Sequence, residues 1–523
     1  MTIQDNLLRI VAAPADGSGL DIVIVSTTTM DQETFWQHRL EAGRGYVCRC
    51  DALVLAVTED WPGGAGNGLG TLYALQTAAL KASTMFGRDL MAELNEGAAV
   101  GLYHTAGKGT RLAPLPGGEG NNKPAVKLPA SVKIDGHPEP MTILEAVIRQ
   151  TAVYAHGRRG RVGVFWGDQV FIPSNPPPAT TTHHVDILAS LGPMPDSDAW
   201  TARGLERYGL IAVGATGDAV QVEKVDHATA NGLVQNGVIA VEGGIGVSLG
   251  SFSISAAMTT ALLDEFADEL AAKTEKLDTD PHFWMPMTLD AATYRTMMNA
   301  KGVASAQADS HYARMRIFLD RLVQSHPEAG VFGCVDIGAD GWWWDYGTIG
   351  GYLGNNLKLL GDDAEAAGMR SFFGLQETTA PAGLELSGGS VLIDCSIRTG
   401  HVHGSVLVGV RADRIETSGS VMVNVTCPSI RGDELLLYNV PEANPMNLDS
   451  GTVRTDAFLP ERGRLTLWSR TDRDGKDDWH ERLPGNALSW DELHTANTEA
   501  DAAEVAMMSR EAFARLREDQ WRS

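Results

Sequence analysis

Cysteine is scarce in this sequence, and its spacing does not suit a disulfide or zinc scaffold. The 523 residues include five cysteines, an odd number with no CxxC pair. Disulfide-built domains and structural zinc sites need grouped cysteines, so neither is expected. Cys48 and Cys50 alternate within Tyr46–Cys50, a pattern that predicts a strand with small side chains rather than a thiol site.

Long apolar runs and positive charge are also in short supply. No stretch approaches the ~18 apolar residues of a membrane helix, and Met1–Ile10 has neither the basic nor the apolar region of a signal peptide. We therefore expect a soluble, cytoplasmic protein without a membrane partner. With 42 Lys and Arg against 66 Asp and Glu, the net charge is −24, which argues against nucleic acid as a partner.

Glycine and positive charge are concentrated in one segment. The apolar run Ala98–Tyr103 predicts a buried strand, and Thr105–Pro129, TAGKGTRLAPLPGGEGNNKPAVKLP, follows it. Glycines after a strand let backbone N–H groups converge on a phosphate, because no Cβ blocks the approach and positive φ is permitted. The cations of this segment are Lys108, Arg111, Lys123 and Lys127. The segment therefore predicts a phosphate site in an otherwise acidic chain.

A second glycine-rich loop precedes this one. Strands are predicted over Asp21–Ser26 and Ala52–Val57, with a helix over Met30–Glu41 between them. The loop Pro62–Thr71 then opens a helix predicted from about residue 72 to residue 94. A helix N-terminus attracts phosphate or polar base edges. A plain strand-to-helix turn remains the alternative for this loop.

The following residues continue to alternate between strands and helices. A helix-spaced apolar stripe covers Met141–His156, and the strand Arg161–Trp166 ends in Gly167-Asp168. The apolar run Gly330–Gly338 leads to Trp342-Trp343-Trp344-Asp345-Tyr346-Gly347-Thr348. Further strands are predicted over Tyr208–Ile211, Ala219–Val225 and Val247–Ser253. This alternation indicates an α/β domain.

From about residue 380 the sequence becomes repetitive. Gly-Ser-Val recurs at Gly389, Gly404 and Gly419, a spacing of 15 residues, with apolar residues six apart inside the repeats. This predicts a β-solenoid of about three coils. Because a left-handed hexapeptide coil takes about eighteen residues, the handedness stays open. His401 and His403 lie in one coil, where they are either an acyltransferase base or, as we favour, a stacked surface pair.

The segment Thr105–Pro129 resembles the signature loop of the sugar-1-phosphate nucleotidyltransferases, and we use that name for it. The family pattern is G-x-G-T-R-[LM] followed by K-P, and the matching residues are Gly107, Gly109, Thr110, Arg111, Leu112, Lys123 and Pro124. The resemblance implies a Rossmann-like nucleotidyltransferase domain over residues 1–374, with a mixed, mainly parallel sheet. The solenoid (380–440) and a C-terminal extension (441–523) follow it.

The same resemblance implies a reaction and a set of site residues. A sugar 1-phosphate attacks a nucleoside triphosphate with the help of Mg²⁺ and pyrophosphate leaves. Arg111 and Lys123 would be catalytic, and Asp168 and Asp345, in G-D and W-D-x-G-T, would bind the metal. The sugar-phosphate contacts would be Gly209, Glu223, Lys224 and Gly250. Val225 replaces the family's proline after the lysine, and Ser248 stands where asparagine is usual.

The order of the motifs narrows the resemblance. Gly109 and Asp168 are only 59 residues apart, so the base-selecting loop precedes the signature loop, at Asn67–Leu72. This order is similar to that in the pyrophosphorylase part of the fucokinase and GDP-fucose pyrophosphorylase group, which implies GTP and a fucose-like or mannose-like 1-phosphate. The nucleotide contacts it implies are Asn67, Gly68, Gly70, Thr71, Ala106, Gly107, Lys108, Gly109 and Thr110.

Three questions stay open at the level of sequence. The chain could be a catalytically inactive, sugar-nucleotide-binding regulatory subunit. It could also be a UDP-sugar or ADP-sugar pyrophosphorylase of other sugar specificity. For residues 441–523, a cap on the solenoid and a contact in a homo-oligomer are both compatible with the sequence.

Overall fold

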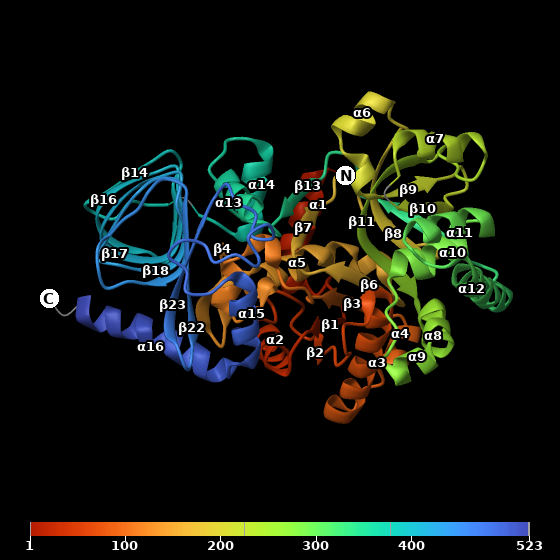
Figure 1. Cartoon of the computed structure of the whole chain (residues 1–523), viewed down its shortest axis with the longest axis horizontal. Helices are drawn as coiled ribbons and strands as arrows, with labels where there is room; N and C mark the ends of the chain where they lie inside the picture. The colour runs from red at the N-terminus through yellow and green to blue at the C-terminus, as the bar shows by residue number, and fades with distance from the viewer. Residues whose placement is uncertain (1, 224, 377, 521–523) are drawn as a thin grey trace. The chain divides into compact units, whose positions relative to one another are not determined.

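The computed structural model describes residues 2–223, 225–376 and 378–520 (Figure 1). By internal contacts the chain divides into two compact units. The first consists of Met1–Ala106, Thr151–Trp166 and Ile172–Trp342, and the second of Gly107–Gln150, Gly167–Phe171 and Trp343–Ser523. The signature loop from Gly107 onward thus belongs to the same unit as the C-terminal region. The three segments proposed from sequence, with boundaries near residues 374 and 440, stay a prediction.

The first unit is built on a nine-stranded mixed sheet. Its main path runs β10-β9-β11-β6-β3-β1-β2, and β8 joins β11 to β12. Four strands, β2, β1, β3 and β6, pair with one another in parallel along this path, whereas β11 is antiparallel to β6, β8 and β9. The strands are β1 Ile22–Thr27, β2 Leu53–Thr58, β3 Ala99–His104, β6 Arg161–Trp166, β8 His183–Gly192, β9 Gly209–Val213, β10 Ala219–Glu223, β11 Gly244–Ser255 and β12 Gly330–Asp336. The predicted α/β class with parallel strands is confirmed.

Helices cover this sheet because its parallel strands are apolar on both faces. β1 and β3 are buried at every residue. The helical segments are α1 Ile3–Asp16, α2 Met30–Ala42, α3 Gly66–Phe86, α4 Leu90–Asn95, η4 Ala152–Arg158, α6 Ser197–Ala202, η5 Leu205–Arg207, α7 His227–Gln235, α8 Ala256–Glu265, α9 Ala267–Ala272, η6 Asp280–Trp284, α10 Met285–Thr288, α11 Ala291–Ala300 and α12 Ser305–Ser325. One apolar core joins the sheet to α3, α4, α8, α9, η6, α10 and α12 and includes Phe252, Phe283 and Trp284.

Two local predictions in this unit are wrong. The helix after the glycine-rich loop begins at Gly66 rather than near residue 72, and it ends at Phe86, where Gly87 adopts φ +64°. The alternation in Tyr46–Cys50 does not produce a strand. Gly45 turns the chain with φ +81° and donates its N–H to the carbonyl of Cys48, so the segment folds into turns.

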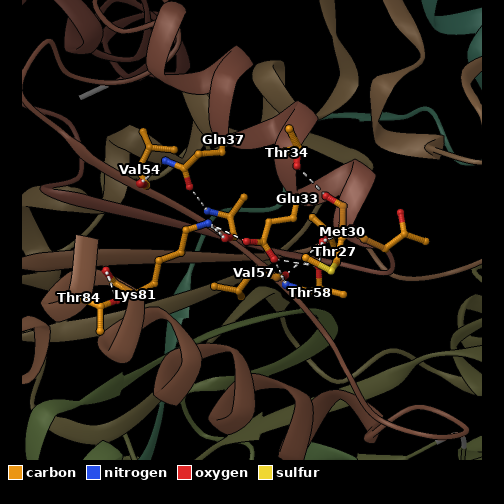
Figure 2. A network of polar contacts seen from close by, with 12 residues as sticks. Thr27, Met30, Glu33, Thr34, Gln37, Val54, Val57, Thr58, Lys81 and Thr84 are labelled. Carbon is orange, nitrogen blue, oxygen red and sulfur yellow. Dashed lines mark hydrogen bonds and ion pairs between the residues drawn. The ribbon is translucent and has the colours of Figure 1, made fainter. Parts of the chain in front are cut away.

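The edge strand β2 is covered by polar side chains from two helices. Figure 2 shows Glu33 of α2 accepting two hydrogen bonds from Thr58, from its N–H and its hydroxyl, each at 2.8 Å. Gln37 Oε1 accepts from the N–H of Ala56 at 2.9 Å, and Lys81 of α3 donates to the carbonyl of Ala56 at 2.7 Å and to Glu33 at 2.8 Å. These bonds satisfy backbone groups that an uncovered edge would offer to another strand.

The second unit begins with the signature loop and small strand pairs. Its helical and strand segments up to residue 373 are η1 Thr110–Leu112, η2 Leu115–Glu119, η3 Lys123–Ala125, β4 Lys127–Ile134, β5 His137–Thr142, α5 Ile143–Thr151, β7 Gln169–Ile172, β13 Trp342–Asp345, α13 Ile349–Lys358 and α14 Ala364–Phe373. β4 pairs with β5, and β7 pairs with β13. The helix predicted over Met141–His156 is divided into α5 and the 3₁₀ segment η4.

The Gly-Ser-Val repeats form a parallel ladder in which equivalent residues are 15 positions apart. Val391 pairs with Val406, Val406 with Val421, and Val421 with Leu436. Each repeat serine supports the next, since Ser390 Oγ accepts from the N–H of Ser405 at 3.2 Å and Ser405 Oγ from that of Ser420 at 3.0 Å. The strands of the sheet that contains this ladder are β14 Leu384–Ser387, β15 Val391–Ile393, β16 Ser396–His403, β17 Val406–Ser418, β18 Val421–Thr426, β19 Ser429–Arg431, β20 Leu436–Pro441, β21 Met446–Asn447, β22 Thr452–Leu459 and β23 Gly463–Arg470, of which β23 is antiparallel to β22.

The chain then continues into two helices. They are α15 Trp490–Glu499 and α16 Ala502–Gln520. Trp479, Trp490 and Leu493 pack with the hairpin of β22 and β23 in a separate small core. Across the described ranges, no helix combines the length and the apolar character that crossing a membrane requires.

Candidate functional site

The signature loop depends on two glycines with left-handed backbone conformations. Gly107 has φ +131° and Gly109 has φ +66°, and the 3₁₀ turn η1 begins directly after Gly109. An alanine Cβ at position 109 would lie 3.1 Å from the Cβ of Lys123. Glycine therefore both permits the turn and lets Lys123 lie against it, which brings the two ends of the motif together.

Lys123 is paired with Asp168. The Lys123 ammonium lies 2.5 Å from Asp168 Oδ2, and the two side chains are 15% and 20% exposed. Asp168 follows β6 by two residues, and β6 pairs with β3 so that Trp166 is opposite His104. The carboxyl ends of β3 and β6 are therefore neighbours, and the segments that carry Arg111 and Asp168 follow them in the chain.

Asp345 joins this pair through the strand pair of β7 and β13. The N–H of Tyr346 donates to the carbonyl of Asp168 at 3.3 Å, and the N–H of Gly347 donates to Asp345 Oδ1 at 2.7 Å. An alanine Cβ at position 347 would lie 2.9 Å from Asp345 Oδ1, 3.4 Å from Asp168 Oδ2 and 3.6 Å from Arg111 Nη2. We call Arg111, Lys123, Asp168 and Asp345 the charge cluster. All four were predicted from sequence, and the structure brings them together around Gly347.

Two residues that were not predicted as site residues support the charge cluster. Gly347 leaves the space in which its charged groups meet, and its place in W-D-x-G-T was the available signal. Asn355 donates from its side-chain amide to the carbonyl of Asp345 at 2.8 Å. No sequence motif indicated Asn355, because its contact with Asp345 depends on how α13 packs against β13.

The three tryptophans before Asp345 have different environments. Trp344 is fully buried against Phe372 and donates from Nε1 to Glu365 at 3.0 Å. Trp343 is 38% exposed, with its ring 6.4 Å from that of Phe171. Because alternate residues of a strand point to the same face, Trp343 and Asp345 share a face of β13. Trp344 therefore has a packing role, while Trp343 is partly exposed to solvent on the face of β13 that carries Asp345.

The two carboxylates of the charge cluster fit magnesium better than a structural metal. In the part of the chain that the structure describes, no group of three or more His, Cys, Asp or Glu residues is arranged to hold a metal ion. Mg²⁺ is commonly bound by one or two carboxylates together with substrate phosphates and water. Asp168 and Asp345 supply that number of ligands, so they suit a magnesium ion that arrives with a polyphosphate.

The predicted nucleotide loop of the first unit is occupied by protein. The N–H of Asn67 donates to Asp278 Oδ1 at 3.0 Å, and that of Gly68 donates to the carbonyl of Leu277 at 2.9 Å. An alanine Cβ at position 68 would lie 2.8 Å from the same carbonyl, and one at Gly70 would lie 2.9 Å from a carboxylate oxygen of Glu59. The glycines at 68 and 70 are therefore explained by close packing, and their contact with a nucleotide stays a prediction.

Thr71 of this loop is bonded to a buried histidine at the end of β3. The Thr71 hydroxyl donates to the carbonyl of Asn67 at 2.7 Å and lies 2.8 Å from His104 Nε2. The hydroxyl therefore accepts from Nε2, which carries the proton. Burial lowers the pKa of His104 to about 4, so the imidazole is neutral at physiological pH. His104 was not predicted as a site residue, although it precedes the signature loop directly.

The predicted sugar-phosphate residues lie in the first unit. Gly209 begins β9 opposite Glu223, the last residue of β10, and Lys224 lies outside the described residues. Gly250 has φ +73°, and an alanine Cβ there would lie 2.5 Å from Trp166 Nε1. Ser248, in the place of the usual asparagine, accepts a hydrogen bond from the N–H of Gly250 at 3.0 Å. Ala106, the last residue of this unit before the signature glycines, is exposed.

The two histidines of the repeat region stack on one another. Their ring centroids are 6.3 Å apart, and Ser387 Oγ lies 3.1 Å from His401 Nε2 and 2.9 Å from His403 Nδ1. This is the stacked pair favoured from sequence.

No family model and no curated protein matches this chain. The case for its function therefore depends on the residues themselves. The feature that most needs explaining is a group of two cations and two carboxylates gathered from three distant segments of the second unit.

Proposed function

We propose that this chain is a magnesium-dependent sugar-1-phosphate nucleotidyltransferase, which makes a nucleotide sugar and pyrophosphate from a nucleoside triphosphate and a sugar 1-phosphate. The observation that carries the proposal is the convergence of the charge cluster on Gly347. In this reaction an oxygen of the sugar phosphate attacks the α-phosphate, and the protein mainly aligns two anions and balances their charge. Two cations beside two carboxylates are suited to that task.

Each member of the charge cluster has a distinct role in this proposal. The exposed Arg111 guanidinium binds phosphate oxygens and stabilises the charge that develops on the α-phosphate. Lys123, held by Asp168, supplies a second positive charge beside it. Asp168 and Asp345 would hold the magnesium ion with their carboxylate oxygens. Magnesium, when bound, neutralises phosphate charge and orients the triphosphate.

The proposal extends to the architecture and the compartment. The parallel strands β2, β1, β3 and β6 would form a Rossmann-like sheet. The ladder with a 15-residue register would be a short β-solenoid. All five cysteines are free thiols, which supports a reducing compartment such as the cytoplasm.

A substrate screen tests the proposal. GTP, UTP, ATP and CTP would each be combined with fucose-like, mannose-like and glucose-like 1-phosphates, with and without Mg²⁺, and pyrophosphate release measured. The motif order leads us to expect the highest rate with GTP and a fucose-like or mannose-like 1-phosphate. A preference for UTP or ATP would support the same reaction class with a different nucleotide specificity. Release with none of the combinations would refute the proposal.

A sugar-nucleotide-binding subunit without catalysis is the second candidate. The observation in its favour is that Asp168, one of the two proposed magnesium ligands, is already paired with Lys123, while Arg111 is exposed to bind phosphate. Such a protein would bind a nucleotide sugar in calorimetry but would release no pyrophosphate from any substrate pair. The two measurements together separate the candidates.

A further inference from the structure

The C-terminal extension is bonded directly to the signature loop. Asn121 donates from its side-chain amide to the carbonyl of His494 at 2.7 Å, and Asn497 donates to the carbonyl of Gly117 at 3.0 Å. The two extension residues are 373 and 380 positions along the chain from their partners. An alanine Cβ at Gly475 would lie 2.5 Å from the carbonyl of Thr110, so the extension also packs closely on the turn before Arg111.

One cation of the loop is held by this extension. The Lys108 ammonium lies 3.4 Å from Asp491 Oδ1 and 5.7 Å from the ring centre of Trp479. Lys108 is exposed, with 55% of its side chain accessible. Its terminal ammonium is therefore the part of this contact that can move.

Asp491, by contrast, is fixed in place. Its Oδ1 accepts from Trp479 Nε1 at 2.9 Å, and its N–H donates to the Trp479 carbonyl at 3.0 Å. It lies in the first turn of α15, which Ser489 and Glu492 begin with a reciprocal pair of capping hydrogen bonds. Its other oxygen, Oδ2, lies 3.4 Å from His480 Nδ1. The hydrogen bond from Trp479, with a smaller contribution from Lys108, lowers the pKa of this carboxyl, so it is ionised at neutral pH.

We propose that Asp491 is a positioning residue that holds Lys108 on the C-terminal extension and competes with a polyphosphate for its ammonium. The inference depends on the proposed function, because it takes the signature loop as the triphosphate site. The Lys108 ammonium interacts less strongly with a polyphosphate while it is paired with the Asp491 carboxylate. That carboxylate, beside the signature loop, also repels phosphate. The extension would thus set the affinity of the loop for nucleotide and leave the chemical step unchanged.

The direct test is the variant Asp491→Asn in the full chain. Asparagine keeps the oxygen that accepts from Trp479 but removes the charge that holds Lys108. Because exposed ion pairs of this length are weak, we expect KM for the nucleoside triphosphate to fall about two- to fivefold with kcat unchanged. In a Lys108→Met background the same substitution should leave KM unchanged. Glu481→Gln, which removes one exposed negative charge from the same extension, is the matched control and should leave KM as in the wild type.

A binding measurement separates this inference from the proposed function. Inorganic tripolyphosphate titrated into the protein in a calorimeter gives the affinity of the signature loop for polyphosphate without any turnover. Tighter binding by Asp491→Asn, lost in the Lys108→Met background, would support the inference even if no substrate pair released pyrophosphate. Unchanged or weaker binding, a gain that persists without Lys108, an equal gain in Glu481→Gln, or no tripolyphosphate binding by the wild type would each overturn it.

Discussion

Lys123 and Asp168 form an ion pair with Nζ 2.5 Å from Oδ2, across 45 residues of sequence. The pair links the K-P end of the signature loop to the segment that follows β6. Each partner is largely buried, so separating them would leave a charge with little solvent to compensate it. The pair therefore fixes the spacing between a cation and a carboxylate that both belong to the proposed site.

Replacing the carboxylate should abolish catalysis. Asp168→Asn removes one of the two proposed magnesium ligands and the charge that holds Lys123. We expect pyrophosphate release to fall at least ~10²- to 10³-fold, which is the usual cost of losing one preorganised electrostatic group. Circular dichroism would verify that the fold is retained. Asp340→Asn, at an exposed aspartate outside the charge cluster, should keep full activity. A wild-type rate in Asp168→Asn would contradict the assignment.

Gly347 provides a test that changes no charge. In Gly347→Ala, the added Cβ would lie 2.9 Å from Asp345 Oδ1, closer than such contacts allow, so the Asp345 carboxylate must move. We expect kcat to fall tenfold or more, since misplacing a reacting group by about 1 Å can cost ~10²-fold. Gly350→Ala is the matched control, because a Cβ there meets no atom within 4 Å and lies in α13. Equal kcat values for the two variants would show that Gly347 has no role in the site.

The charge cluster could be anticipated from sequence, because each of its residues lies in a short motif next to a strand. Buried parallel strands are continuous apolar runs, and this is why β1, β2, β3 and β6 could be predicted from the sequence. Contacts such as Lys108 with Asp491, or Asn67 with Asp278, were not predictable. They connect residues 383 and 211 positions apart and depend on how whole elements pack, which hydrophobic periodicity does not encode.

The repeat region was predicted from its period, but the reason for the serine appears only in the structure. Ser405 is fully buried, donates to the carbonyl of His403 at 2.8 Å and accepts from the N–H of Ser420 at 3.0 Å. Its hydroxyl therefore connects successive repeats inside the ladder.

Removing that hydroxyl should destabilise the second unit. Ser405→Ala leaves the buried N–H of Ser420 without an acceptor, which costs about 1–3 kcal/mol in the free energy of unfolding. Urea denaturation would measure the loss. Ser418→Ala, at the partly exposed serine that ends β17, is the control and should cost less than about 0.5 kcal/mol. Equal midpoints for the two variants would mean that the serine ladder contributes nothing to stability.

His104 should make the protein sensitive to mild acid. Its pKa falls from 6.5 to about 4 on folding because it is buried, so between these values the unfolded chain binds a proton that the folded chain does not. The stabilisation from neutral His104 is complete above pH 6.5 and is lost as the pH falls toward 4, by up to about 3 kcal/mol. Thermal unfolding followed between about pH 7 and pH 4.5 should show this loss in the wild type.

The histidine can be isolated by substitution. His104→Gln keeps an amide donor for Thr71 but cannot titrate, so its unfolding temperature should depend less steeply on pH than that of the wild type. His156→Gln, at an exposed histidine of the same unit, should retain the wild-type slope. If both variants followed the wild-type curve, the acid sensitivity would have to come from another group, and the buried pair of Thr71 and His104 would not control it.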